Sequence, residues 1–350
     1  MPTRAAFCLF IWWFRLQLRE EELQRMRKVK DFATHAEQLA ILEKRGLIVT
    51  DKAAAKRVLS RENYYALIDG YKEPFLERDE KLNPYGMERF EKGTEFDHIY
   101  ALHSFDRNLR LLMLHQLLKF EKNIKSKVAY RFSEKFKNPA SFLEPDNYSA
   151  DVQRHHERDR IISTLANLIK SHKKRDKVRY PAIREFYDKH KDVPLWVLVN
   201  FLSLGQITHF YAVIDDELRE RIAKDFAEEY SEEHDSISFH ARDMDAILRI
   251  VFPYRNKSAH EEVLYRYRFA HPVELEALEK KIAMEKGQLS SATVYAVQSL
   301  LKFVLEKDDY EQFSTELVQL TQQLETTIQK SAFVKIMKDA GFDKGTKLQI

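Results

Sequence analysis

A long periodic segment constrains the fold more than any other feature of the sequence. Between Phe96 and Phe136, apolar residues recur three or four positions apart, which is the spacing of one face of an α-helix. The residues of this stripe are Leu102, Phe105, Leu109, Met113, Leu117, Phe120, Ile124 and Val128. The chain has only 8 glycines and 9 prolines, and its apolar stretches lack the regular turn punctuation of an all-β or α/β protein. The sequence therefore predicts an all-α protein.

The chain of 350 residues exceeds one typical domain, and its helical signals divide it into three parts. Residues 26–93 are expected to form an N-terminal helical unit, in which Asp51 caps a helix over Lys52–Arg61. Residues 94–270 are expected to form the main helical bundle, and residues 271–350 a helical C-terminal extension. Further helices of the bundle are predicted over Asp151–Lys177, from Pro181, from Pro194, over Ser203–Ile214 and over Ser236–Phe252.

Two local features add to this organisation. Gly205 is expected to allow close packing of the helix on which it lies. Tyr64, Tyr65 and Tyr71 are interpreted as helix-packing aromatics and not as base-stacking platforms, because aromatic residues at such spacing usually fill a core.

The N-terminal segment holds the only membrane-like stretch, Ala5 to Phe14. Its ten apolar residues fall well short of the roughly 20 that a spanning helix needs, and no small-residue cleavage site follows. We expect residues 1–25 to be translated upstream sequence, with Met26 as the true start; an amphipathic N-terminal anchor is the alternative. The single cysteine, Cys8, cannot form an internal disulfide. These features predict a soluble cytoplasmic protein that does not associate with a membrane.

Basic and acidic residues are segregated along the chain. Residues 119–137 carry seven basic and two acidic side chains, residues 154–179 carry nine and three, and residues 215–235 carry three and ten. The net charge of +3 is too small to indicate a nucleic-acid partner by itself. Two interpretations stay open, a basic surface for polyanions and ordinary solvated helix faces.

One short polar segment has the residue types that phosphate chemistry needs. Arg255, Asn256, Lys257 and His260 follow Pro253 within a few positions. Proline is favoured at the first position of a helix, so we expect a helix to begin at Pro253 and to hold Arg255 and Asn256 in its opening turn. There, free backbone N–H groups and the helix dipole would attract a phosphate, and the arginine would clamp it with two parallel hydrogen bonds.

The spacing of this segment suits RNA cleavage without a metal ion. Arg255 and His260 are separated by about 7.5 Å along an ideal helix and about 140° around it, whereas Asn256 and His260 share a face. The reach of arginine would still let both groups contact one phosphodiester. His260 would act as general acid or base, Arg255 would stabilise the phosphorane, and Asn256 would orient one of them. Neither a cluster of cysteine and histidine with zinc spacing nor clustered carboxylates for Mg²⁺ accompany the motif, so no metal or cofactor is expected.

Four sequence blocks follow one another in an order that is typical of a known family. They are Asn63–Tyr71 with Pro74–Phe75, Phe105–Arg110, Pro194–Trp196 with Leu204–Gly205, and Arg255–Asn256 with Ala259–His260. These blocks resemble bacterial Abi-like abortive-infection proteins of the AbiD and AbiF group. The resemblance extends from about Asp31 to Phe269.

The resemblance implies a branch of the HEPN superfamily, whose members are helical RNases and RNA-binding modules with an R-x4-6-H motif. It therefore implies an HEPN-like helical bundle. The long helix of the family carries a glutamate followed four residues later by an arginine; here Glu121 is followed by Lys125. Both are candidate supporting or RNA-binding residues, together with Lys257, although Glu121 and Lys125 also have the spacing of an ordinary ion pair on a helix. Such RNases usually join two motifs across an interface, so a homodimer is expected.

Three functions are compatible with these features. The leading one is an abortive-infection effector of antiphage defence that cleaves RNA without a metal ion, with Arg255, Asn256 and His260 as catalytic residues. The alternative is a non-catalytic RNA-binding module that uses the same motif to hold a structured RNA. A protein-interaction module is the third. RNA is the expected partner, and an antitoxin or a regulatory RNA is a further candidate.

Overall fold

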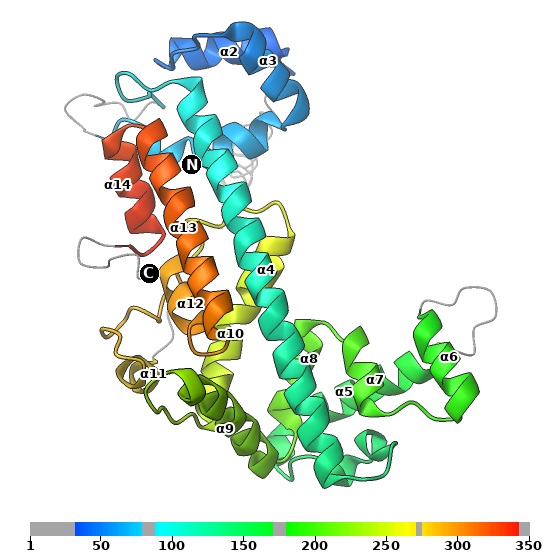
Figure 1. Ribbon diagram of the computed structural model, residues 1–350. Helices are drawn as coiled ribbons and strands as arrows, with labels where there is room; N and C mark the ends of the chain where they lie inside the picture. Colours follow the sequence, from blue (N-terminus) through cyan, green and yellow to red (C-terminus); the bar gives the residue numbers. More distant parts are fainter. Residues whose placement is uncertain (1–31, 79–87, 171–179, 271–274, 343–350) are drawn as a thin grey trace, which may run out of the picture. The chain divides into compact units, whose positions relative to one another are not determined.

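The computed structural model describes residues 32–78, 88–170, 180–270 and 275–342 (Figure 1). Helices dominate these ranges, which contain no β-strand beyond two isolated bridges, between Ile48 and Glu95 and between Tyr148 and Ile214. The all-α prediction is confirmed. Residues 1–25, with the predicted start at Met26, lie outside the described residues. Among the described helices, none is both long and apolar enough to cross a membrane.

The chain divides into two compact units, of which the first comprises Met1–Asn63 and Glu77–Phe96. Its described helices are α2 (His35–Lys44) and α3 (Lys52–Arg61). Asp51 caps α3 as predicted, because its carboxylate accepts hydrogen bonds from the backbone amides of Ala53 and Ala54 at 2.9 and 2.8 Å.

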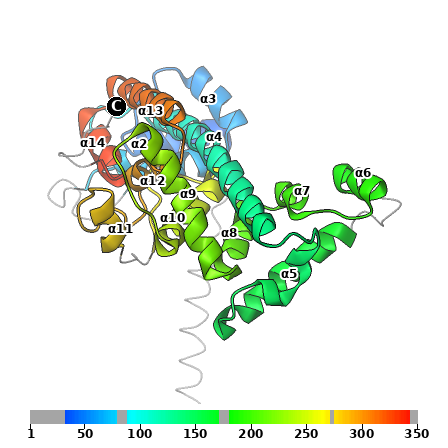
Figure 2. The same cartoon turned by 60° about the horizontal axis from the view of Figure 1, so that its bottom comes forward.

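The second unit comprises Tyr64–Leu76 and Asp97–Ile350, and the long helix α4 (Phe96–Lys135) runs through it. The structure confirms the predicted helix almost to the residue. Every position of the predicted apolar stripe is buried, from Leu102 to Val128. Helix α4 lies alongside α13 (Lys307–Thr327) in both views, and Lys119 bonds to Asp309 of α13 at 2.6 Å (Figures 1 and 2).

The remaining helices of this unit begin mostly where proline or a capping residue predicts them. They are α5 (His155–Lys170), α6 (Pro181–His190), α7 (Leu195–Leu198), α8 (Leu204–Val213), α9 (Asp216–Glu233), α10 (Ala241–Ala259), α11 (Glu276–Lys281), α12 (Val294–Leu301) and α14 (Lys330–Asp339). Short turns of 3-10 or π type accompany the helices: η1 (Tyr65–Asp69) and η2 (Glu73–Phe75) precede α4, and η7 (Val199–Phe201) links α7 to α8. The helix predicted over Ser236–Phe252 is displaced toward the C-terminus, where it forms α10.

The segment Tyr64–Leu76 and the C-terminal helices both belong to this second unit. Tyr71 and Phe75 are buried, which confirms the packing role predicted for Tyr71, whereas the side chain of Tyr65 is 74% exposed and is not a core residue. Helix α14 packs against η2, and Lys335 Nζ donates a hydrogen bond to the carbonyl oxygen of Pro74 at 3.2 Å.

Close packing between α8 and α10 depends on Gly205. A Cβ atom at this position would lie 2.9 Å from Cε2 of Phe252, a distance that real Cβ contacts essentially never show. The prediction made for Gly205 is therefore confirmed. On its other side α8 packs on α4, where the rings of Phe132 and Phe210 have their centroids 5.4 Å apart.

The segregated charges of the sequence meet between α4 and α9. Arg131 donates to both carboxylate oxygens of Asp225, from Nε at 2.7 Å and from Nη2 at 2.6 Å. Further ion pairs join Lys127 to Glu229, Lys135 to Glu217 and Arg154 to Asp216. Three of the seven basic residues in 119–137, Lys127, Arg131 and Lys135, thus pair with acidic residues of 215–235.

Candidate functional site

The polar motif lies at the C-terminal end of α10. This helix continues through Pro253 to Ala259, and His260 is its C-cap, so the prediction that a helix starts at Pro253 is wrong. A proline inside a helix removes one backbone hydrogen bond. The helix nevertheless continues, because residues on both sides of the proline, Val251 and Tyr254, are fully buried in the core.

This placement changes the electrostatics expected for the motif. The C-terminal end of a helix carries a partial negative charge and unpaired carbonyl groups, so neither the helix dipole nor free amides attract a phosphate to Arg255 and Asn256. Lys257, in the last turn, instead has the charge that this helix end favours. Attraction of an anion must therefore come from the side chains.

Three of the candidate residues form one cluster between α4 and α10. Arg255 donates from Nε to Oε2 of Glu121 at 2.9 Å, and Lys125 donates from Nζ to Oε1 of the same carboxylate at 2.7 Å. Each oxygen of Glu121 thus has its own cationic donor. The Glu121 side chain is only 8% exposed, and such a buried carboxylate needs both partners to offset its loss of hydration.

The guanidinium of Arg255 uses only its Nε donor in this cluster. Neither Nη atom forms a hydrogen bond with any residue in the described ranges, and the side chain is 26% exposed. An arginine held through Nε can still offer its two Nη groups to a planar pair of phosphate oxygens. The cluster holds two cations and one anion, so it keeps a net positive charge.

The other motif residues are not hydrogen-bonded to this cluster. Asn256 is half-buried and His260 is exposed, and neither side chain forms a hydrogen bond with the described part of the chain. Lys257 pairs with Glu262, and its ammonium lies 4.7 Å from the ring centroid of Tyr267. The structure therefore brings Glu121, Lys125 and Arg255 together but holds Lys257 toward the segment that follows the helix.

A buried carboxylate anchors the chain just beyond the motif. Asp106 of α4 is fully buried and accepts hydrogen bonds from the Tyr71 hydroxyl at 2.8 Å and from Arg110 Nη1 at 2.6 Å. It also accepts from the backbone amides of Leu264 at 3.1 Å and Tyr265 at 2.7 Å. Burial raises the pKa of Asp106, and the hydrogen bonds from the amides and the nearby Arg110 guanidinium oppose that rise.

The sequence contains a signal for this anchor, which lies outside the polar motif and was not among the predicted site residues. Asp106 lies four residues after Leu102 and three before Leu109, within the apolar stripe of α4. A carboxylate on a buried helix face needs a buried partner, and Arg110 one turn later supplies it. Arg110 Nη1 also donates to the carbonyl oxygen of Glu262 at 3.2 Å, so the pair fixes the segment that leaves α10.

The match to a known family covers this arrangement. Residues 57–266 match the family described as Abi-like protein, and this range includes Tyr71, the Asp106 anchor, the Glu121 cluster and the polar motif. The chain belongs to the Abi-like protein family. Family membership suggests a role in abortive-infection defence. Comparisons with curated proteins and with solved structures found no match.

The Abi-like protein has a groove of about 770 Å³ that begins at this cluster. Glu121 and Lys125 line it from α4, and Trp196 of α7 and Asn200 of η7 line its other side. Helix α7 lies beside α4 in both views (Figures 1 and 2). A volume of this size is within the range of ligand sites, about 300–1,000 Å³. The groove therefore shares two candidate residues, Glu121 and Lys125, with the cluster.

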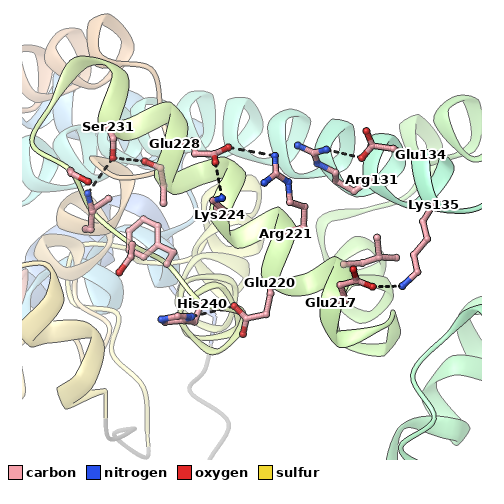
Figure 3. A pocket seen from close by; sticks show the side chains of 16 residues that line it. Arg131, Glu134, Lys135, Glu217, Glu220, Arg221, Lys224, Glu228, Ser231 and His240 are labelled. Carbon is pink, nitrogen blue, oxygen red and sulfur yellow. Dashed lines mark hydrogen bonds and ion pairs between the residues drawn. The ribbon is translucent and has the colours of Figure 1, made fainter.

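A second cavity, of about 790 Å³, lies between α4, α9 and the segment Ser236–His240. Its charged side chains are mostly paired with one another, as Figure 3 shows. The pairs drawn there join Arg131 to Glu134, Lys135 to Glu217, Arg221 and Lys224 to Glu228, and His240 to Glu220. Because these charges balance within the cavity, it is a weaker candidate for an anionic ligand. Within the described residues, no group of three or more side chains could hold a metal ion.

Proposed function

We propose that this Abi-like protein is an abortive-infection effector that cleaves RNA without a metal ion, and that its motif is of the HEPN type. The observation that supports the proposal best is the Glu121 carboxylate, which holds Arg255 at 2.9 Å and Lys125 at 2.7 Å. It fixes the arginine through Nε and leaves the Nη donors for a phosphate. Asn256 and His260 follow Arg255 within the same helix end.

In this mechanism the 2′-hydroxyl of one nucleotide attacks the adjacent phosphate. The proton of the hydroxyl passes to a base, the bond to the 5′-oxygen breaks, and an acid protonates the leaving oxygen. His260 takes the base or the acid role, Arg255 stabilises the negative charge of the phosphorane, and Asn256 orients one of them. The products are a 2′,3′-cyclic phosphate and a 5′-hydroxyl, and an RNA with a 2′-deoxy residue at the cut should resist.

A homodimer would supply both proton-transfer groups. One chain offers one His260, and a second copy would bring a second histidine and a second Arg255, so that acid and base become separate residues. We therefore propose that two copies join their motifs. Light scattering on the purified protein tests this, and a strict monomer that still cleaves RNA would contradict it.

The decisive test compares RNA cleavage by three variants in EDTA. His260→Ala should reduce the rate by about 10²- to 10⁴-fold because proton transfer is lost, while RNA binding should survive. Arg255→Lys keeps the charge but loses the planar fork, so it should also be impaired. His115→Ala, which removes an exposed histidine on α4, is the matched control and should cleave normally. Loss of activity in EDTA, or a normal rate for His260→Ala, would place the active site elsewhere.

A non-catalytic RNA-binding module is the second candidate. The observation that favours it is that the exposed imidazole of His260 has no described hydrogen-bond partner to orient it for proton transfer. On this alternative, Arg255→Lys weakens RNA binding more than His260→Ala does, and no variant or wild-type protein forms product. Product analysis with a radiolabelled RNA separates the two functions.

A further inference from the structure

The groove beside the Glu121 cluster carries aromatic side chains that are open to solvent. Trp196 of α7 is 54% exposed and Tyr130 of α4 is 60% exposed, and both line the groove. Large aromatic rings are usually buried, so two exposed rings at one hollow need an explanation. The face of an aromatic ring can stack on any nucleobase.

The same groove holds the two basic residues of the segment 119–137 that form no ion pair within the described ranges. Of the seven basic residues in 119–137, five form ion pairs with acidic residues, namely Lys119, Lys125, Lys127, Arg131 and Lys135. Lys122 and Lys137 form no ion pair with any residue that the structure describes, and both line the groove. The two acidic residues of the groove, Glu121 and Glu134, are already paired with cations.

We propose that this groove binds a single-stranded stretch of RNA, with unpaired bases stacked on Trp196 and Tyr130 and with phosphates held by Lys122 and Lys137. The combination of a basic groove with stacking rings is what single-stranded nucleic acid requires. A duplex hides its base faces and is bound through its shape and backbone, so it would leave these rings unused. The inference rests on the proposed function in one respect, that the strand is the RNA on which the motif acts.

The groove is continuous with the site through shared residues. Glu121 and Lys125 line the groove and also form the cluster with Arg255, so a strand in the groove ends beside the motif. A second copy of the chain is a less suitable occupant, because lysines are depleted in the cores of protein interfaces and burying Lys122 and Lys137 without partners would be costly.

The test uses the intrinsic fluorescence of Trp196. The chain has 3 tryptophans, so the full-length protein with Trp12→Phe, Trp13→Phe and His260→Ala has Trp196 as its single tryptophan and does not consume the RNA. Excitation at the red edge of the absorption band, where tyrosine does not absorb, isolates its signal. A short unstructured RNA should quench this fluorescence with saturation, and a fully paired RNA of the same length should bind more weakly. In a second binding assay, which follows labelled RNA instead of tryptophan, Trp196→Ala should lower the affinity about 5- to 150-fold, whereas Trp196→Phe, which keeps a ring, should retain most of it.

The lysines are tested by the salt dependence of binding. Replacing Lys122 and Lys137 by Ala removes two phosphate contacts, so the slope of log K against log salt should become shallower by about 1.4. Lys330→Ala, which removes an exposed lysine of α14, is the control and should leave the slope unchanged.

The outcomes separate this inference from the proposed function. If Trp196 is not quenched and Trp196→Ala binds like the parent, while the protein with His260 intact still cleaves RNA, the groove is not the RNA site and the nuclease proposal stands. If RNA quenches Trp196 but the protein with His260 intact forms no product, the groove binds single-stranded RNA and the nuclease proposal fails. Tighter binding of the paired RNA would overturn the single-strand inference. So would a dimer that becomes a monomer on Trp196→Ala, because the groove would then be an interface between copies.

Discussion

The Asp106 anchor gives the sharpest prediction about how the motif is held. Replacing Asp106 by Ala leaves the buried guanidinium of Arg110, only 6% exposed, without its carboxylate partner. It also leaves the amides of Leu264 and Tyr265 without the acceptor that they now bond at 3.1 and 2.7 Å. Two of these losses fall on the segment that follows His260, and the third concerns Arg110 of α4, which also donates to the carbonyl oxygen of Glu262 in that segment.

The expected loss of stability in Asp106→Ala follows from the kinds of interaction that are removed. Breaking a buried ion pair by removing one partner costs about 3–5 kcal/mol, and each buried amide without an acceptor adds about 1–3 kcal/mol when the structure does not relax. Because such terms are not additive, we expect a total of about 3–5 kcal/mol, a large share of the roughly 5–15 kcal/mol that stabilises a domain. Asp106→Asn keeps an acceptor for the amides and should cost about 1.5–3 kcal/mol.

Hydrogen exchange measures this effect locally, which matters because a chain of two units need not unfold in one step. In Asp106→Ala, peptides that cover Leu264 and Tyr265 should exchange about 10²- to 10³-fold faster, whereas Asp159→Asn, a change at an exposed acid of α5, should leave the exchange unaltered. If Asp106→Ala and Asp106→Asn both preserve the protection of these amides, the network does not anchor the segment and the reasoning is refuted.

Three further predictions concern the packing around α4 and α8. Gly205→Ala should cost about 1–3 kcal/mol, since the new Cβ meets the ring of Phe252 at 2.9 Å, and urea unfolding should show a lower midpoint. Asp225→Asn weakens the two bonds from Arg131, at 2.7 and 2.6 Å, and should cost about 1.5–3 kcal/mol in the same experiment. Ser203→Ala removes the side-chain acceptor that caps α8, so thermal unfolding should report a loss of about 1 kcal/mol. For each of the three variants, an unchanged unfolding midpoint would contradict the role given to that contact.

The sequence predicted the helices well because their signals are local. The stripe of α4, the cap at Asp51 and the helix start at Pro181 all depend on residues within one or two turns of each other. The helix start predicted at Pro253 was wrong because it too relied on local signals alone. A proline that begins a helix and a proline inside a helix look alike over a few residues, and burial of the neighbouring Val251 and Tyr254 by distant helices decided between them.

The contact of Arg255 with Glu121 could not be predicted from the sequence. Arg255 and Glu121 lie 134 residues apart, and no periodic pattern reports a contact over that separation. Arg255 was named from the polar motif, whereas Glu121 was named only from the resemblance to the family. The charge pattern also had two readings from sequence, and only the ion pairs between α4 and α9 show which lysines of residues 119–137 stay available.

The resemblance to the family implies an arginine four residues after the glutamate, and this geometry explains how Lys125 can take that place. Lysine lacks the planar fork, which would matter if the residue had to hold a phosphate with two bonds. Here Lys125 places its ammonium on Oε1 of Glu121 at 2.7 Å, a contact that one point charge satisfies, while Arg255 occupies Oε2. The Nη atoms of Arg255 have no partner among the described residues, so under the proposed function the planar fork is needed only there. Lysine at position 125 preserves the net positive charge of the cluster, and the proposal assigns the phosphate contact to Arg255.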